Sequence, residues 1–240
     1  GPVNAELVYI LRQFGAEVTW ITRGDRLLPT DRLPERAGQA LRRRLRRLGV
    51  DVRTGTTVRE VRPLEDGLAV DLSDGERVDF DRVLVAVGRT PNTEGLGLAE
   101  AGVAVTEGGF IRTNEYLETT AAGIYAVGDV KPGAMNANSA LQEGKAVARN
   151  ALEGNSERSF PDRVPTAIYS ALEIAAVGLS EDRAEAAGFE PVTAQGTFGA
   201  SPKAHAHGAA EGFVEVVLDE ETGQLLGGCI VGPEAGEQIH

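Results

Sequence analysis

An aspartate that directly follows an apolar stretch is the residue of this sequence best placed for chemistry. Gly128 and Asp129 come after the apolar segment Gly123–Val127, and a helical pattern begins near Ala137. A strand that ends in Gly-Asp places a carboxylate at the carboxyl edge of a sheet, where α/β proteins bind ligands. The following helix start offers unpaired N–H groups and positive potential. We therefore predict a ligand site here, with a simple turn aspartate as the alternative.

The histidines and the single cysteine form no recognisable motif. Cys229 lies in the apolar stretch Leu225–Val231, which is typical of a small core residue. His205 and His207 lie among small and polar residues, and a metal site would need further converging ligands. We therefore predict no metal site, and one cysteine cannot form an intrachain disulfide.

The composition is that of a folded protein of one or two domains. Of the 240 residues, 42% are apolar and 25% are charged. No apolar run approaches the roughly 20 residues that a membrane span requires, and the N-terminus lacks a signal-peptide pattern. We expect no membrane association and a cytoplasmic location.

A basic run stands out against a net charge of -12, which opposes general nucleic-acid binding. The run comprises five arginines between Arg42 and Arg47. Leu41, Leu45 and Leu48 recur at helical spacing through it, which favours the polar face of an amphipathic helix over a nucleic-acid patch. We predict no nucleic-acid partner.

The first part of the chain has the element order of a nucleotide-binding α/β domain. Apolar spacing predicts helices, strands and hairpins over 4–14, 18–22, 35–48, 58–64, 68–72 and 77–80, and a buried strand over 83–87. This order predicts a Rossmann-like domain over residues 1–87, whose first strand we expect upstream of Gly1.

The rest of the chain divides at a polar segment around Pro161. Before it, we predict a strand over Gly123–Val127 and a helix over Ala137–Leu152. After it, we predict strands over 166–170, 174–177, 213–218 and 225–231, with Ser180 capping a helix. The second pattern indicates an α+β domain.

Four segments together resemble the class I pyridine nucleotide-disulfide oxidoreductases, the family that contains dihydrolipoyl dehydrogenase, glutathione reductase and mercuric reductase. These segments are 1–7, 83–92, 119–130 and the C-terminal stretch from Val164 through Pro233. The resemblance implies an NAD(P)-binding domain over 1–87, the C-terminal part of an FAD-binding domain over 88–154, a linker over 155–163 and a truncated dimerisation domain over 164–240.

The resemblance also assigns flavin contacts. It places Asp129 at the ribityl hydroxyls of FAD, with Gly128 allowing close approach of the backbone. It places the isoalloxazine ring against four consecutive residues: Met135, Asn136, Ala137 and Asn138. Dihydrolipoyl dehydrogenases usually carry histidine where this chain has Asn138, which keeps other members of the family in consideration.

The remaining cofactor residues follow from the same resemblance. The glycine-rich turn and the helix after it correspond to Gly1, Val3 and Asn4, although a leading Gly-Pro could also be a tag remnant. Glu6 is expected near the flavin, paired with a lysine outside this chain, or else it complements the helix dipole. Gly88 is expected beside the nicotinamide nucleotide. Val58 is expected at the adenine, or in the core.

The preference between NAD and NADP can be argued from charge. An acid about 20 residues after the glycines holds the ribose 2'-hydroxyl of NAD, whereas arginine accommodates the 2'-phosphate of NADP. Here Thr22 replaces the acid, and Arg23 and Arg26 follow it. This favours NADPH, and two solvated surface arginines are the alternative.

The family's catalytic groups do not occur in this sequence. The redox-active cysteine pair and the C-terminal His-Glu pair are absent, so we predict no catalytic residue and no disulfide reduction by this chain alone. The resemblance implies a homodimer acting on a small or protein-bound disulfide, most similar to dihydrolipoyl dehydrogenase and truncated at both ends. Mercuric or glutathione-type reductases remain alternatives, as does a non-catalytic nucleotide-binding and dimerising module.

Overall fold

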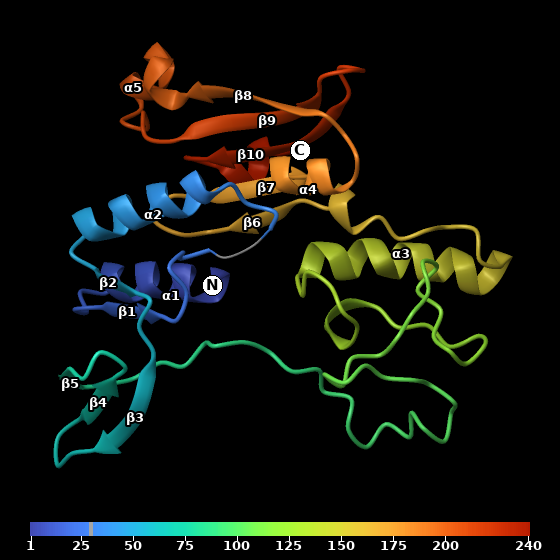
Figure 1. The fold of residues 1–240 in the computed structure, drawn as a ribbon, viewed down its shortest axis with the longest axis horizontal. Coiled ribbons are helices and arrows are strands. Elements are labelled where there is room, and N and C mark those ends of the chain that lie inside the picture. Colours follow the sequence, from blue (N-terminus) through green and yellow to red (C-terminus); the bar gives the residue numbers. More distant parts are fainter. Residues whose placement is uncertain (29–30) are drawn as a thin grey trace. The chain divides into compact units, whose positions relative to one another are not determined.

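The computed structural model describes residues 1–28 and 31–240, which divide into two compact units (Figure 1). Unit 1 combines Gly1–Val87 with Ala167–His240, and unit 2 is the continuous segment Gly88–Thr166. The first change of unit falls after Val87. The segment Ala167–His240 packs with the N-terminal segment as one unit.

The N-terminal part of unit 1 alternates helices and strands. In chain order the elements are α1 (Pro2–Gln13), β1 (Thr19–Thr22), α2 (Glu35–Arg47) and β2 (Asp51–Thr54). β1 and β2 are parallel, with Thr19 opposite Asp51 and Thr22 opposite Thr54. A parallel pair needs a crossover, which α2 supplies, so the carboxyl ends of both strands lie at one edge. The sequence analysis predicted all of these elements except β2.

The helix α1 buries a different face from the one its larger apolar residues suggest. Its buried residues are Ala5 and Val8, whereas Phe14 is 85% exposed. The helix ends as predicted at Gly15, which has φ +87 and donates its amide to the carbonyl of Arg12. The small side chains of Ala5 and Val8 let this face of α1 pack closely against its neighbours. The buried face is therefore the closely packed one and not the one with the largest apolar side chains.

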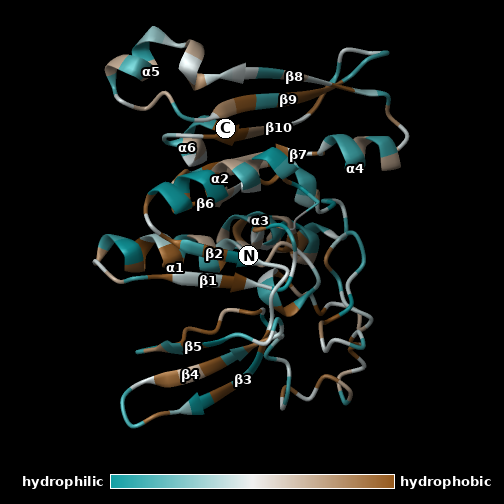
Figure 2. Ribbon diagram, turned by 60° about the vertical axis from the view of Figure 1, so that its left-hand side comes forward, coloured by the Kyte–Doolittle hydropathy of each residue, from teal (hydrophilic) through white to brown (hydrophobic). Residues whose placement is uncertain are grey.

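The arginine-rich helix α2 confirms the amphipathic interpretation. It is mostly hydrophilic in Figure 2, yet Leu41 and Leu45 are fully buried. On its polar side, Arg44 and Arg47 form ion pairs with Glu211. Part of the basic run is therefore already neutralised by carboxylate within unit 1.

A three-stranded antiparallel sheet follows, in the order β3-β4-β5. Its strands are β3 (Val58–Pro63), β4 (Leu68–Leu72) and β5 (Arg77–Phe80), as the alternating pattern predicted. Gly67 in the first turn has φ +96, and a Cβ there would lie 2.6 Å from the carbonyl oxygen of Phe80. Only glycine fits this turn without moving the backbone.

The C-terminal part of unit 1 is built on a five-stranded sheet of order β6-β7-β10-β9-β8. Its elements are β6 (Thr166–Ile168), β7 (Ile174–Gly178), α4 (Glu181–Ala186), β8 (Pro191–Thr197), η3 (Phe198–Ala200), α5 (Pro202–Ala206), β9 (Phe213–Asp219), β10 (Leu225–Val231) and α6 (Ala235–Gln238). Ser180 caps α4 as predicted, its hydroxyl accepting the amide of Arg183. β8, α5 and α6 were not predicted.

One hydrophobic core joins the two sequence segments of unit 1. It combines Trp20 and Leu41 from the N-terminal segment with Ile174 and Val231 from the C-terminal sheet. All four are at most 3% exposed. This core therefore connects the two sequence segments of unit 1, and smaller clusters lie around α4 and α6.

Unit 2 is dominated by loops around one long helix, α3 (Ala137–Glu153). Short 3-10 turns occur at η1 (Gly128–Val130) and η2 (Pro161–Arg163). The loops are joined by isolated bridges, such as Val105 with Ile111 and Thr113 with Thr119. Its small core comprises Val103, Ile111 and Ala126.

Two predicted strands are wrong. Val83–Val87 is not a buried strand: Val85 is 73% and Val87 is 92% exposed. Gly123–Val127 forms only an isolated bridge between Tyr125 and Glu118. A strand needs a neighbour to complete its ladder, and no strand among the described residues pairs with either segment. Apolar content alone therefore did not produce strands here.

Across residues 1–28 and 31–240, no helix has both the length and the apolar character needed to cross a bilayer.

Candidate functional site

The Gly128–Asp129 pair forms a short 3-10 turn with an accessible carboxylate. Gly128 has φ +70, and a Cβ there would lie 3.3 Å from the Cβ of Ala140 on α3. Glycine is favoured here because it takes this backbone shape without strain and without crowding the helix. The side chain of Asp129 is 54% exposed. The turn therefore presents a carboxylate to solvent, although the segment Gly123–Val127 before it does not form the predicted strand.

Arg89 connects this turn with the start of α3. Its Nη1 lies 3.4 Å from Oδ2 of Asp129 and donates to the carbonyl oxygen of Met135 at 2.9 Å. The side chains of Arg89 and Asp129 are both 54% exposed, so the pair contributes at most about 1 kcal/mol. Arg89 belongs to the segment that carries the family resemblance, but its side chain was not predicted to take part in the site.

The residues that precede and begin α3 have a specific local geometry. Met135 adopts φ +48, a left-handed conformation uncommon for a non-glycine residue. Asn136 caps the helix, its Oδ1 accepting the amide of Ser139 at 2.8 Å. The amides of Ala137 and Asn138 have no partner among the described residues, as expected for a first helical turn. The helix start is therefore available to donate hydrogen bonds to an electron-rich ligand atom.

Two charged residues behind the turn were missed by the sequence analysis. Glu143 accepts the amide of Gly128 at 2.7 Å and pairs with the ammonium group of Lys131 at 2.8 Å. Both side chains are buried. In sequence they resemble the exposed charges of any surface helix or loop. The available signal was that Glu143 falls on the same helical face as Ser139 and Asn150, the other buried residues of α3.

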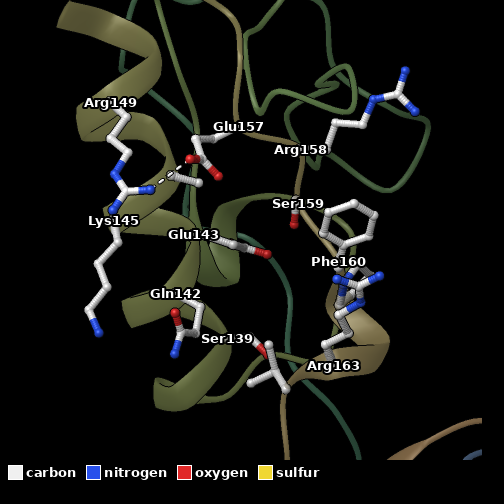
Figure 3. A pocket seen from close by; sticks show the side chains of 13 residues that line it. Ser139, Gln142, Glu143, Lys145, Arg149, Glu157, Arg158, Ser159, Phe160 and Arg163 are labelled. Atoms are coloured by element: carbon white, nitrogen blue, oxygen red, sulfur yellow. Dashed lines mark hydrogen bonds and ion pairs between the residues drawn. The ribbon is translucent and has the colours of Figure 1, made fainter. Parts of the chain in front are cut away.

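A pocket lies on the other flank of α3 within unit 2. It has a volume of about 360 Å³ and lies between the helix and the segment 157–164. Figure 3 shows Glu143 and Ser139 reaching toward it from α3, with Phe160 and Arg163 opposite. Arg149 at its rim is paired with Glu157 at 2.6 Å. The sequence analysis predicted no site at this place.

The carboxyl edge of β1 and β2 carries the predicted nucleotide residues of unit 1. Thr22 ends β1, and its carbonyl oxygen accepts the amide of Thr56. Arg23 and Arg26 are exposed in the loop that follows, and neither forms an ion pair with a described residue. The structure therefore leaves both guanidinium groups accessible at a sheet edge where α/β proteins bind ligands.

The residues predicted around the glycine-rich turn lie at the start of α1. Gly1 is its N-cap and Val3 is 42% exposed. Asn4 donates to the carbonyl oxygen of Ala86 at 3.3 Å, and Glu6 accepts the amide of Tyr169 at 3.0 Å. Glu6 therefore has a structural partner within unit 1.

Val58 and Gly88 lie apart from these contacts. Val58 begins β3 and is 44% exposed. Gly88 has φ +153, and a Cβ there would meet no atom within 4 Å. The space around Gly88 fits the predicted close approach of a ligand to the backbone.

Cys229 is a core residue, as predicted. It is 3% exposed in β10, and burial raises the pKa of its thiol to about 12. The neutral thiol is a poor nucleophile, so this cysteine has no redox or catalytic character. The described residues hold no group of three or more potential His, Cys, Asp or Glu metal ligands.

Comparisons with protein families and curated proteins agree with this geometry. The model of the family described as pyridine nucleotide-disulphide oxidoreductase matches residues 1–144, and its dimerisation-domain model matches residues 164–240. Dihydrolipoyl dehydrogenase from Thermus scotoductus is 43% identical over the whole chain, and that from Chlorobaculum parvum is 37% identical. The chain spans about half the length of these relatives, 52% and 51% respectively.

Solved structures show the same similarity. LpdA from Mycobacterium tuberculosis matches with a TM-score of 0.90 and 27% identity, over 99% of this chain and 51% of its own. The HOCl-induced flavoprotein disulfide reductase RclA from Escherichia coli, solved as a Cu(II) complex, matches with a TM-score of 0.87 and 28% identity, over 100% of this chain and 54% of its own. On the strength of the two family models and this fold, the chain belongs to the pyridine nucleotide-disulphide oxidoreductase family.

Proposed function

We propose that this chain is the part of a FAD-dependent NAD(P)H:disulfide oxidoreductase, of the dihydrolipoyl dehydrogenase type, that holds one side of the flavin, binds the nicotinamide nucleotide and forms the dimer. The accessible Asp129 carboxylate, on a glycine turn next to the open start of α3, is the observation that carries the proposal. Relatives up to 43% identical are named dihydrolipoyl dehydrogenase, which supports the assignment.

The residues of unit 2 fit part of a flavin site. A carboxylate accepts hydrogen bonds from hydroxyl groups such as those of a ribityl chain, and Asp129 offers both oxygens. The amides of Ala137 and Asn138 and the positive end of α3 suit an electron-rich carbonyl oxygen. When bound, the flavin supplies the electron-transfer chemistry, and these residues bind and orient it. We propose Met135 and Asn136 as further contacts with the ring.

Uptake of FAD tests this proposal directly. The purified chain is incubated with FAD and freed of excess cofactor, and its absorbance near 450 nm is measured. We expect bound flavin in the wild type and little in Asp129→Ala, with Asp162→Ala in the same unit as a control. A chain that takes up no flavin would support the alternative of a non-catalytic dimerising module.

We propose that the loop after β1 selects NADPH over NADH. Arg23 and Arg26 are exposed at the carboxyl edge of β1 and have no carboxylate partner among the described residues. A guanidinium group recognises a phosphate through paired hydrogen bonds. The double variant Arg23→Ala/Arg26→Ala should weaken NADPH binding about tenfold, the loss of one charge-assisted contact, and leave NADH binding unchanged. Equal effects on both nucleotides would contradict the proposal.

We also propose a homodimer formed through the five-stranded sheet of unit 1. The dimerisation-domain match over residues 164–240 supports it, as do Tyr169 and Leu225, which are 58% and 63% exposed. Sedimentation equilibrium should give twice the chain mass of 25.3 kDa, and a monomer at all concentrations would contradict the proposal. The cytoplasmic location stays a prediction.

The substrate is proposed only as a class, a small or protein-bound disulfide. The similarity to RclA, titled a flavoprotein disulfide reductase, keeps other disulfide reductases of the family as a second candidate. Asn138 favours this candidate, because dihydrolipoyl dehydrogenases usually carry histidine there. Its side chain lies 3.5 Å from the carbonyl oxygen of Pro165, so replacement with histidine tests whether flavin binding changes with this residue.

A further inference from the structure

A buried ion pair lies directly behind the Gly128–Asp129 turn. The Nζ of Lys131 is 2.8 Å from Oε1 of Glu143, and the two residues are 8% and 6% exposed. Removing two charges from water costs several kcal/mol per ion, so such pairs often add little net stability. Stabilising the fold is therefore not enough to explain why this ion pair is buried here.

The pair is connected to the turn through the second carboxylate oxygen. Oε2 of Glu143 accepts the backbone amide of Gly128 at 2.7 Å. Lys131 follows the turn closely, and its own amide donates to the carbonyl oxygen of Gly128 at 3.3 Å. Glu143 thus holds Gly128, the residue before Asp129, by accepting the Gly128 amide. It holds the end of the turn by its ion pair with Lys131.

Packing alone does not fix the Glu143 side chain. One flank of the residue lines the pocket of about 360 Å³ between α3 and the segment 157–164 (Figure 3). Side chains are held firmly where neighbours fill all the surrounding space, and here one side is open. The hydrogen bond to Gly128 and the ion pair with Lys131 are therefore what hold the carboxylate in place.

We infer that Glu143 and Lys131 are positioning residues, which fix the location of the Asp129 carboxylate by holding the amide of Gly128 against α3. In this arrangement both residues act through the turn, by their contacts with Gly128 and with each other. Glu143 supplies the acceptor for the amide of Gly128, and Lys131 pairs with the other oxygen of the same carboxylate. Only the identity of the ligand, FAD, rests on the proposed function.

Amide hydrogen exchange of the chain itself tests the arrangement without any flavin. The variants are Glu143→Gln, Lys131→Met and the double variant, with exposed Glu153→Gln and Lys145→Met on α3 as matched controls. In Glu143→Gln we expect the Gly128 amide to exchange at least about tenfold faster, because it loses a bond to a charged acceptor. The amide of Val217 in β9 reports on the stability of unit 1 and should not change.

The double variant distinguishes a coupled pair from two separate effects. In Glu143→Gln the buried ammonium of Lys131 competes with the Gly128 amide for the single acceptor oxygen of glutamine. Removing Lys131 as well frees that oxygen, so Gly128 should regain at least about threefold protection relative to Glu143→Gln, as coupled residues do in a double-mutant cycle. Faster exchange in the double variant would overturn the inference.

Flavin affinity provides the second measurement. We expect the dissociation constant for FAD to rise about tenfold in Glu143→Gln and to stay within about twofold of wild type in both controls. Unchanged exchange at Gly128, or an equal increase at Gly128 and throughout unit 2, would show a merely structural role and overturn the inference. If the wild-type chain takes up no FAD, the proposed function fails, and the exchange experiment still decides the role of Glu143.

Discussion

The five-stranded sheet of unit 1 and the loops of unit 2 satisfy their backbone groups by different means. In the sheet, β7, β10, β9 and β8 pair in antiparallel ladders, interrupted between β10 and β9 by one register shift at Leu225–Gly227. In unit 2, isolated bridges alternate with turns, and buried side chains complete the pairing. Asn150 shows this best, since its amide group bonds four backbone groups of two loops.

This difference in backbone pairing predicts which substitutions destabilise each region. A ladder distributes its stability over many similar bonds, so it tolerates most side chains but not an obstruction of the backbone. A loop region concentrates its stability in a few polar side chains, each of which leaves several groups unpaired when removed. Substitution of closely packed glycines should therefore destabilise unit 1 most. Substitution of buried polar residues should destabilise unit 2 most.

The largest effect should come from Gly212→Ala in unit 1. Gly212 has φ +120, and a Cβ there would lie 1.9 Å from the carbonyl oxygen of Val231. Relieving this overlap requires β10 to move, so we expect a loss of at least about 4 kcal/mol in the free energy of unfolding. Urea denaturation measures it. Gly223→Ala is the control, because Gly223 also has positive φ but open space around it.

The next effect should come from Asn150→Ala in unit 2. The side chain is 1% exposed and donates to the carbonyl oxygens of Tyr116 and Glu157, both at 2.9 Å. Losing these bonds without replacement should cost about 3 kcal/mol. Thermal denaturation and amide exchange of residues 156 and 157 measure it. The exposed Gln142→Ala on the same helix should be close to neutral, and an equal loss there would contradict the comparison.

A smaller effect is expected for Gly128→Ala, because this glycine of unit 2 combines a positive φ with a close contact to α3. The φ of +70 costs alanine about 1–2 kcal/mol, and the nearby Cβ of Ala140 at 3.3 Å must yield slightly. The control Gly123→Ala has φ +77 but no atom within 4 Å. Urea denaturation should show a larger loss for Gly128→Ala than for the control. Equal losses would mean that contact with α3 does not constrain the turn.

The smallest effect concerns the turn between β9 and β10. A hydrogen bond from the hydroxyl of Thr222 lowers the pKa of Asp219, with amides of Glu190 and Thr222 acting in the same direction. A pKa lowered by folding stabilises the protein above the unfolded value, near 3.9, and this contribution is lost as pH falls through the folded value. Asp219→Asn should therefore be less stable than wild type at pH 7.

Measuring the unfolding free energy of both proteins as a function of pH tests the prediction for Asp219→Asn. The difference in unfolding free energy between wild type and Asp219→Asn should shrink as the pH is lowered below about 4. Glu221→Gln, at an exposed position of the same turn, serves as control. A difference independent of pH would show that the charge of Asp219 does not matter.

Local signals predicted the helices and hairpins well because their causes lie in neighbouring residues. The apolar spacing of Leu41 and Leu45 and the cap at Ser180 are examples. The strand predictions over 83–87 and 123–127 were wrong because a strand depends on a partner far away in sequence. β2 was missed because it is four residues long and contains mostly polar residues.

The candidate site was predictable only at positions that belong to a recognisable sequence motif. Gly128 and Asp129 form a turn rather than the end of the predicted strand, and the predicted helix begins at Ala137. Lys131 was missed because nothing in the local sequence distinguishes it from a solvated charge. Glu143 was missed because the helical face that it shares with Ser139 and Asn150 is polar in sequence. The burial of both charges follows from the close approach of the turn to α3, which depends on the folded unit.

The extended segment Val83–Val87 has a consequence for the colloidal behaviour of the chain. Leu84, Val85 and Val87 are exposed, Val83 and Ala86 are half-buried, and the carbonyl of Ala86 accepts a bond from Asn4. Such a segment can add to a strand of another copy and start aggregation. The net charge of -12 keeps copies apart at low ionic strength. Added salt screens that repulsion, so the chain should stay dispersed in dilute buffer and self-associate as salt is raised.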